Sequence, residues 1–152
     1  MISVSSGRID AQAVFTNRLQ NIYGMHQFVR QAAIDAGFSN VALGDIELAV
    51  VEACANIIKH AYRDFPEDSA PIEVHVHFDW GQLAITLSDW GSAFVPPRGK
   101  VAAPDVDRMI SDERRGGMGI FFMQQMMDEV AWDIRPGVCN RLRMIKRLEG
   151  AA

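Results

Sequence analysis

The stretch that decides the fold is ELAVVEACANIIKHAY, which runs from Glu47 to Tyr62. Its apolar residues recur at intervals of three and four, as on one face of a helix, and Asp45 is placed to cap that helix. The expected apolar stripe consists of Leu48, Val51, Ala55 and Ile58. A polar stripe with a four-residue repeat lies beside it and consists of Glu52, Asn56 and His60. The pattern predicts one helix from about residue 45 to residue 62.

The polar stripe has two interpretations. The simpler one is a solvated helix face, which the stripe alone favours. The other is chemical, because Glu52 and Asn56 are one helical turn apart. An amide oxygen at Asn56 can bind Mg²⁺ while the carboxylate of Glu52 takes a proton from a hydroxyl nucleophile.

The flanking sequence predicts further helices and strands. Alternating residues in 2–18 indicate one or two short edge strands, and helical spacing over 22–36 ends at Gly37. Alternation predicts a hairpin of residues 72–79 and 83–87 around Trp80–Gly81. A helix with Ile120, Met123, Met127 and Val130 on one face and a closing hairpin of 130–134 with 141–147 complete the order. One sheet covered by helices on one face, an α+β fold, fits this order.

Composition limits the class of protein. The 152 residues are 49% hydrophobic and 22% charged, which is typical of one globular domain. A net charge of -4 gives no broad electrostatic footprint for direct nucleic-acid contact. No apolar run is long enough to span a bilayer and no secretory signal is recognisable, so we expect a cytoplasmic protein without membrane contact. Cys54 falls inside the helical pattern and is expected to be buried.

Two glycine-containing segments follow the long helix. Ser88-Asp89-Trp90-Gly91 comes directly after an apolar strand. There Asp89 is either a turn former or an acceptor for an exocyclic amine, with Gly91 letting a ligand approach the backbone.

The segment RRGGMGI, residues 114–120, opens the next helix. Glycines before a helix expose N–H groups that suit phosphate, although a glycine-rich hinge has the same composition. The spacing is neither that of a Walker A loop nor that of the dinucleotide fingerprint. Residues 90–117 between the two glycine segments form a long connection with a short helical stretch around 106–110.

In this order the three segments resemble the N, G1 and G2 boxes of the GHKL ATPases, most specifically the anti-sigma-factor serine/threonine kinases of the RsbW type. The resemblance covers residues 12–147 and implies one ATP-binding domain over residues 1–152. The implied fold is a two-layer α/β sandwich with a mixed, mostly antiparallel sheet, helices on one face and an ATP lid at about residues 90–116. Ala93 stands where many members have a second glycine, but Phe94-Val-Pro96 looks like the anti-sigma branch.

The resemblance also implies roles for individual residues. Glu52 matches the general base, Asn56 the Mg²⁺ ligand, Asp89 the adenine-reading carboxylate, and Arg115 the lid arginine that faces the terminal phosphate. His60 matches a family position that either binds nucleotide or packs against the loop. The nucleotide-binding set implied by the resemblance is Asn56, His60, Asp89, Gly91, Phe94, Gly117, Met118 and Gly119.

The function implied is that of a Mg-ATP-dependent protein serine/threonine kinase that regulates transcription by partner switching. Its expected substrate is a STAS-type anti-anti-sigma protein, with a sigma factor as the alternating partner and a homodimer as the expected assembly. An alternative is an ATP-binding module that sequesters a partner without phosphorylating it, which Glu52 argues against because a pure binder needs no base. The catalytic half of a histidine kinase is disfavoured, since residues 1–40 are too few for a phosphoacceptor hairpin and a first strand.

Overall fold

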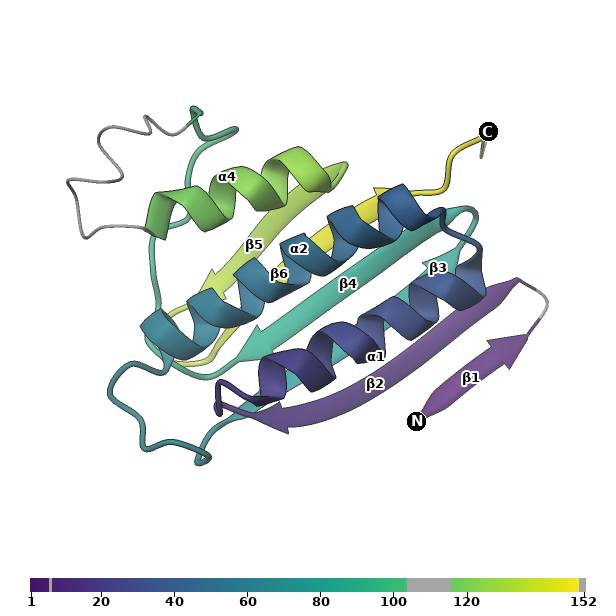
Figure 1. Ribbon diagram of the computed structural model, residues 1–152. Helices are drawn as coiled ribbons and strands as arrows, with labels where there is room; N and C mark the ends of the chain where they lie inside the picture. The colour runs from purple at the N-terminus through teal and green to yellow at the C-terminus, as the bar shows by residue number, and fades with distance from the viewer. Residues whose placement is uncertain (6, 104–115, 151–152) are drawn as a thin grey trace.

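The computed structural model describes residues 1–5, 7–103 and 116–150. A six-stranded sheet in the order β1-β2-β3-β4-β6-β5 carries its helices on one face (Figure 1). The expected α+β class and two-layer arrangement are confirmed, and the antiparallel character extends to all five pairings described. The elements are β1 Ile2–Ser5, β2 Arg8–Thr16, α1 Asn21–Ala36, α2 Asn40–Asn56, the π-helical turn η1 Ile57–Ala61, β3 Pro71–Asp79, β4 Gln82–Asp89, α4 Gly116–Met126, β5 Glu129–Arg135 and β6 Cys139–Arg147.

The core lies between the helices and the inner face of the sheet. The alternation predicted for the central hairpin is confirmed. The buried apolar residues of β3 and β4 are Ile72, Val74, Val76, Phe78, Leu83, Ile85 and Leu87. Trp80 and Gly81 both have positive φ, 52° and 72°, so they form the tight turn that suits a two-residue hairpin loop.

Helix α1 follows its prediction closely. It begins at Asn21 and ends where Gly37 adopts a left-handed conformation with φ 93°. The first two strands are less well predicted as edge strands, because β2 is paired on both sides and, of the two, only β1 lies at an edge of the sheet.

Helix α2 differs from its prediction at its start and on its buried face. Ser39 caps it by accepting a hydrogen bond from the Ala42 N–H (3.3 Å), whereas Asp45 lies within the helix with a carboxylate oxygen 3.4 Å from Lys146 Nζ. The expected apolar stripe is wrong, since Leu48 is 36% exposed and the other three members are half-buried. The buried set is Leu43, Ile46, Ala49, Val50, Ala53 and Cys54. Because α2 is apolar on most sides, the expected stripe and the buried stripe both have helical spacing, and the sequence alone does not distinguish them.

The position of α2 between α1 and α4 selects which of these stripes is buried. Cys54 is buried as expected, and that burial raises the pKa of its thiol to about 12. The long helix does not continue regularly to residue 62, because its last turn widens into η1. There the Tyr62 N–H donates to the carbonyl of Ile57 (2.9 Å).

Helix α4 and the closing hairpin complete the fold. Met123 and Met127 are buried and Ile120 is half-buried, as the expected helix face requires. However, α4 ends at Met126, and Val130 lies on β5. The predicted helical stretch around residues 106–110 lies outside the described residues. None of the helices in the described ranges combines the length and apolar character that a membrane crossing requires.

Candidate functional site

A cavity of about 410 Å³ lies between the end of α2, helix α4 and the ends of β4, β5 and β6. Four of the residues predicted from the sequence line it: Asn56, His60, Asp89 and Phe94. The apolar part of the lining includes Ile57, Ile120, Met123, Trp132, Ile134 and Leu142. A mostly apolar cavity of this size with a few polar groups is typical of a small-molecule site.

Asp89 is the buried carboxylate of the cavity. It is 5% exposed, and its Oδ1 accepts hydrogen bonds from the Gly91 N–H and from Asn140 Nδ2, both at 2.9 Å. Burial raises the pKa of Asp89, and these two hydrogen bonds offset part of that rise. No described residue donates a hydrogen bond to Oδ2, so this oxygen remains an acceptor for a ligand.

Asn140 is a site residue that the sequence prediction missed. It lies on β6 directly opposite Asp89, is buried, and lines the cavity. Its Nδ2 also lies 3.2 Å from the carbonyl oxygen of Gly91 and 3.3 Å from that of Ser92. Three acceptors around one nitrogen fix the orientation of the amide. The signal in the sequence was that Asn140 is a polar residue at one of the alternate positions of β6 that face inward.

The structure requires a glycine at position 91 for a reason different from the one expected. A Cβ atom at this position would lie 2.2 Å from the carbonyl oxygen of Ala61. Next to it, the Ser92 N–H donates to that same oxygen at 2.8 Å. The glycine therefore lets the loop after β4 pack against the backbone of η1, while its contact with a nucleotide stays a prediction.

Glu52, Asn56 and Gly119 are brought together where α4 begins. A Cβ atom on Gly119 would lie 2.9 Å from Glu52 Oε2, 3.3 Å from Asn56 Nδ2 and 3.6 Å from Asn56 Oδ1. The polar stripe of α2 therefore faces the first turns of α4, beside the cavity. A carboxylate, an amide and a helix start thus meet at one point, which is an arrangement able to hold phosphate and metal oxygen ligands.

Of the other predicted residues that the structure describes, two lie in the first turn of α4 and two at the cavity. Gly117 is in the first turn of α4 and Met118 is half-buried after it. His60 is exposed on η1 at the cavity, and Phe94 packs edge-on against Trp132 with ring centroids 6.0 Å apart. Arg115 and the part of the expected lid formed by residues 104–115 lie outside the described residues.

The described residues hold no group of three or more His, Cys, Asp or Glu side chains that would bind a metal ion alone. Asn56 nevertheless fits Mg²⁺ as a single oxygen ligand, because this ion is commonly held by one or two protein oxygens together with substrate phosphates.

Curated relatives and a solved structure resemble this chain. A protein of Listeria innocua named "Serine-protein kinase RsbW" is 34% identical over 97 residues, which cover 62% of this chain and 60% of the relative. A protein of Staphylococcus aureus with the same name is 32% identical over 105 residues, which cover 68% of this chain and 65% of the relative. The chain thus spans less than two thirds of these relatives. The structure of the RsbU and RsbW domains of Rv1364c from Mycobacterium tuberculosis matches 91% of this chain and 32% of that one, with a TM-score of 0.60 and 12% identity, a likeness of fold.

The family predicted from the three sequence segments is therefore confirmed on independent grounds. A model of the family described as "Histidine kinase-like ATPase domain" matches residues 15–146, which include the cavity and the meeting point of α2 with α4. The chain belongs to the histidine kinase-like ATPase family.

Proposed function

We propose that the protein is a Mg-ATP-dependent protein serine/threonine kinase of the anti-sigma-factor type. The observation that carries the proposal is the packing of Gly119 against Glu52 and Asn56, next to a cavity with an acceptor carboxylate at Asp89. Relatives named as serine-protein kinases support the same reaction class.

The base end of the nucleotide site is at Asp89. Its Oδ2, to which no described residue donates, accepts a hydrogen bond from the 6-amino group of adenine, and the apolar lining, with Met123 and Trp132, contacts the purine ring. Guanine has a carbonyl oxygen at the equivalent position, which repels the carboxylate. The site is therefore selective for adenine nucleotides.

The phosphate end is at the start of α4. The N–H groups of the turn that contains Gly117 and Gly119 face the phosphates at the positive end of the helix dipole. Asn56 Oδ1 would hold Mg²⁺, which would neutralise part of the phosphate charge. Arg115 is proposed to contact the terminal phosphate.

Glu52 is the proposed general base. Its carboxylate takes the proton from the serine or threonine hydroxyl of the substrate while that oxygen bonds to the terminal phosphorus and the bond from phosphorus to the ADP oxygen breaks. We propose a STAS-type anti-anti-sigma protein as the substrate, a sigma factor as the alternating partner, and a homodimer as the assembly. The RsbW-type resemblance supports this assignment.

The test is phosphoryl transfer from labelled ATP to candidate STAS-domain proteins by wild type and Glu52→Gln. The variant keeps the size of the side chain and removes its basicity, so transfer should fall by roughly 10²–10⁴-fold. ATP affinity should stay nearly unchanged, because the proposed nucleotide contacts are made by other residues. Glu47→Gln, on the same helix but paired with Arg30 at 2.7 Å, is the matched control and should transfer phosphate normally.

Two outcomes would contradict the proposal. Transfer by Glu52→Gln at the wild-type rate removes Glu52 from the role of base. Tight ATP binding and partner capture without any transfer by the wild type would show the alternative, a binding module that sequesters its partner.

A further inference from the structure

We propose that Arg63 recognises the base end of the bound nucleotide, and that Asn17, the residue after β2, positions it through the loop of residues 63–70. The inference rests on the proposed ATP binding. Arg63 lines the cavity and is the second residue after η1, whereas Asn17 contacts the other end of the loop.

The start of the loop is anchored next to Asp89. Tyr62 is 2% exposed, and its hydroxyl donates to the carbonyl of Pro71 (2.5 Å) and accepts from the Trp90 N–H (2.9 Å). Burial raises the pKa of Tyr62 to about 12, so the hydroxyl stays a donor at neutral pH. Since Trp90 follows Asp89, the anchor places Arg63 on the side of the cavity where the base binds.

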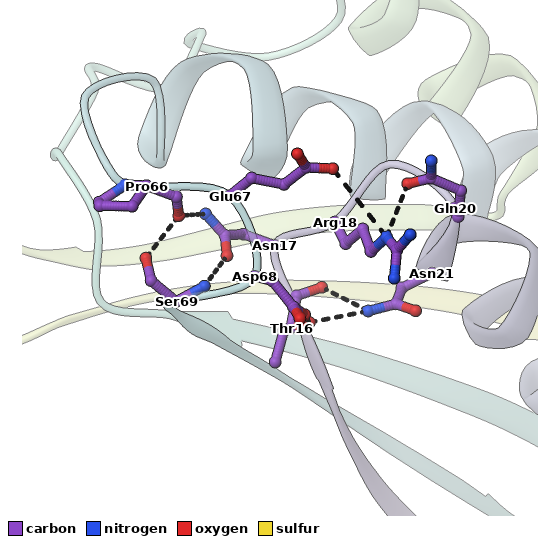
Figure 2. Close-up of polar contacts among 9 residues, drawn as sticks. All are labelled: Thr16, Asn17, Arg18, Gln20, Asn21, Pro66, Glu67, Asp68 and Ser69. Carbon is purple, nitrogen blue, oxygen red and sulfur yellow. Dashed lines mark hydrogen bonds and ion pairs between the residues drawn. The ribbon is translucent and has the colours of Figure 1, made fainter.

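The end of the loop is anchored by one buried side chain (Figure 2). Asn17 is 4% exposed. Its Oδ1 accepts from the N–H groups of Ser69 (2.8 Å) and Ala70 (3.0 Å), and its Nδ2 donates to the carbonyl of Pro66 (3.0 Å). A buried amide with three hydrogen bonds to one loop fixes that loop strongly, because each broken bond leaves an unsatisfied group.

The loop's contacts with Thr16 and Arg18, also drawn in Figure 2, are exposed. Thr16 Oγ1 donates to Asp68, and Arg18 lies 4.0 Å from Glu67 with both side chains more than half exposed. An exposed ion pair of this kind adds little stability. Asn17 is therefore the residue whose loss should loosen the loop most.

The two anchors are connected through Phe65. Its ring packs edge-on against that of Tyr62 with centroids 4.9 Å apart. A movement of the loop caused by a change at Asn17 would therefore also displace Phe65 and Tyr62, which lie on either side of Arg63.

Arg63 itself is exposed and available to a ligand. Within the described part of the chain its guanidinium has no ion-pair partner at 4.0 Å or less. Among the described cavity-lining residues, the carboxylate belongs to Asp89 and the guanidinium groups to Arg63 and Arg141. A planar guanidinium stacks on a purine face, and a lysine ammonium does not reproduce that stacking.

Contact with the base makes a specific prediction. The contribution of Arg63 should be the same for ATP, ADP, AMP and adenosine, because all four carry the same base. An arginine that binds phosphate would instead contribute more as the number of phosphates rises.

The experiment measures the affinity of the full chain for these four compounds by calorimetry. Arg63→Ala should weaken all four by about three- to tenfold, and Arg63→Lys should recover only a small part of that loss. Arg8→Ala, an exposed arginine on β2 that pairs with Asp79, is the control and should leave all four affinities unchanged.

Asn17 is tested by a double-mutant cycle. Asn17→Ala should weaken adenosine binding in the wild-type background and have little effect in the Arg63→Ala background, because it acts through Arg63. A general structural role would give the same loss in both backgrounds. Asn17→Asp, which keeps the two accepted bonds and loses the donated one, is the milder variant if Asn17→Ala does not fold.

Several results overturn the inference. Unchanged affinities in Arg63→Ala, or a loss that grows with the number of phosphates, removes Arg63 from the base end. Equal losses for Asn17→Ala in both backgrounds remove its positioning role. If the wild type binds none of the four compounds, the proposed function fails, and the inference fails with it.

Discussion

The packing of Gly91 against η1 gives the most direct prediction for stability. In Gly91→Ala the new methyl would lie 2.2 Å from the carbonyl oxygen of Ala61 and 2.5 Å from its carbonyl carbon. Both are backbone atoms, so no rotamer change relieves the contact. The loop after β4 must move away from η1 instead.

The size of the effect follows from what this movement breaks. The hydrogen bond from the Ser92 N–H to Ala61 (2.8 Å) and that from the Trp90 N–H to Tyr62 (2.9 Å) are lost or lengthened. Each contributes about 1 kcal/mol, and overpacking adds about 1–3 kcal/mol. After subtraction of a gain of about 0.4–1 kcal/mol from the stiffer unfolded chain, a net loss of about 3 kcal/mol remains.

The assay is thermal unfolding without nucleotide, followed by circular dichroism. For a chain of this length, a loss of this size lowers Tm by about 6–12 °C. Gly44→Ala is the matched control, since Gly44 is an exposed position of α2 where a Cβ meets nothing within 4 Å. Alanine there should raise Tm by about 2–4 °C through helix propensity. A melting temperature for Gly91→Ala equal to that of the wild type would refute the argument that the loop depends on this close approach.

Two other changes separate stability from activity. In Gly119→Ala the new methyl meets the movable ends of the Glu52 and Asn56 side chains, so Tm should change by less than about 4 °C. Phosphoryl transfer should nevertheless fall at least about tenfold. Unchanged transfer would show that these side chains do not act in this arrangement. Burial raises the pKa of Asp89 in the folded protein above its value in the unfolded chain. At pH values between these two pKa values folding takes up a proton, so the stability of the fold is lost as pH rises through that range. Urea unfolding should therefore show that Asp89→Asn is at least as stable as the wild type at neutral pH, although its ATP binding is weakened. This difference in stability should disappear in acid. A difference that grows in acid would contradict the direction of the pKa shift.

The sequence predicted the parts of the site that depend on local patterns. Glu52 and Asn56 of the predicted four-residue repeat lie together beside Gly119, whereas His60 lies on the widened turn η1. The alternation of β3 and β4 identified the buried face correctly. Asp89 could be placed at the end of a strand from its neighbours alone. These features need only the periods of helices and strands.

The features that were missed depend on packing between distant segments. The buried stripe of α2 is selected by α1 and α4, which the periodicity of one helix cannot show. The true cap, Ser39, comes six residues before the expected one, because the buried face already begins at Leu43, ahead of Asp45. Asn140 is recognisable as a site residue only once β6 is known to pair with β4.

The widened turn η1 has a consequence for changes in the length of the chain. Each residue of an α-helix advances the chain by about 100° around the axis, and the wide turn takes up one residue of that rotation. Deleting a residue within 57–61 would therefore let the chain continue as a regular helix, with Tyr62 and Arg63 near their present orientation. Inserting a further residue there would instead rotate both residues by about 100° and turn the carbonyl of Ala61 away from Ser92. This end of the helix therefore tolerates the loss of one residue more readily than the gain of one.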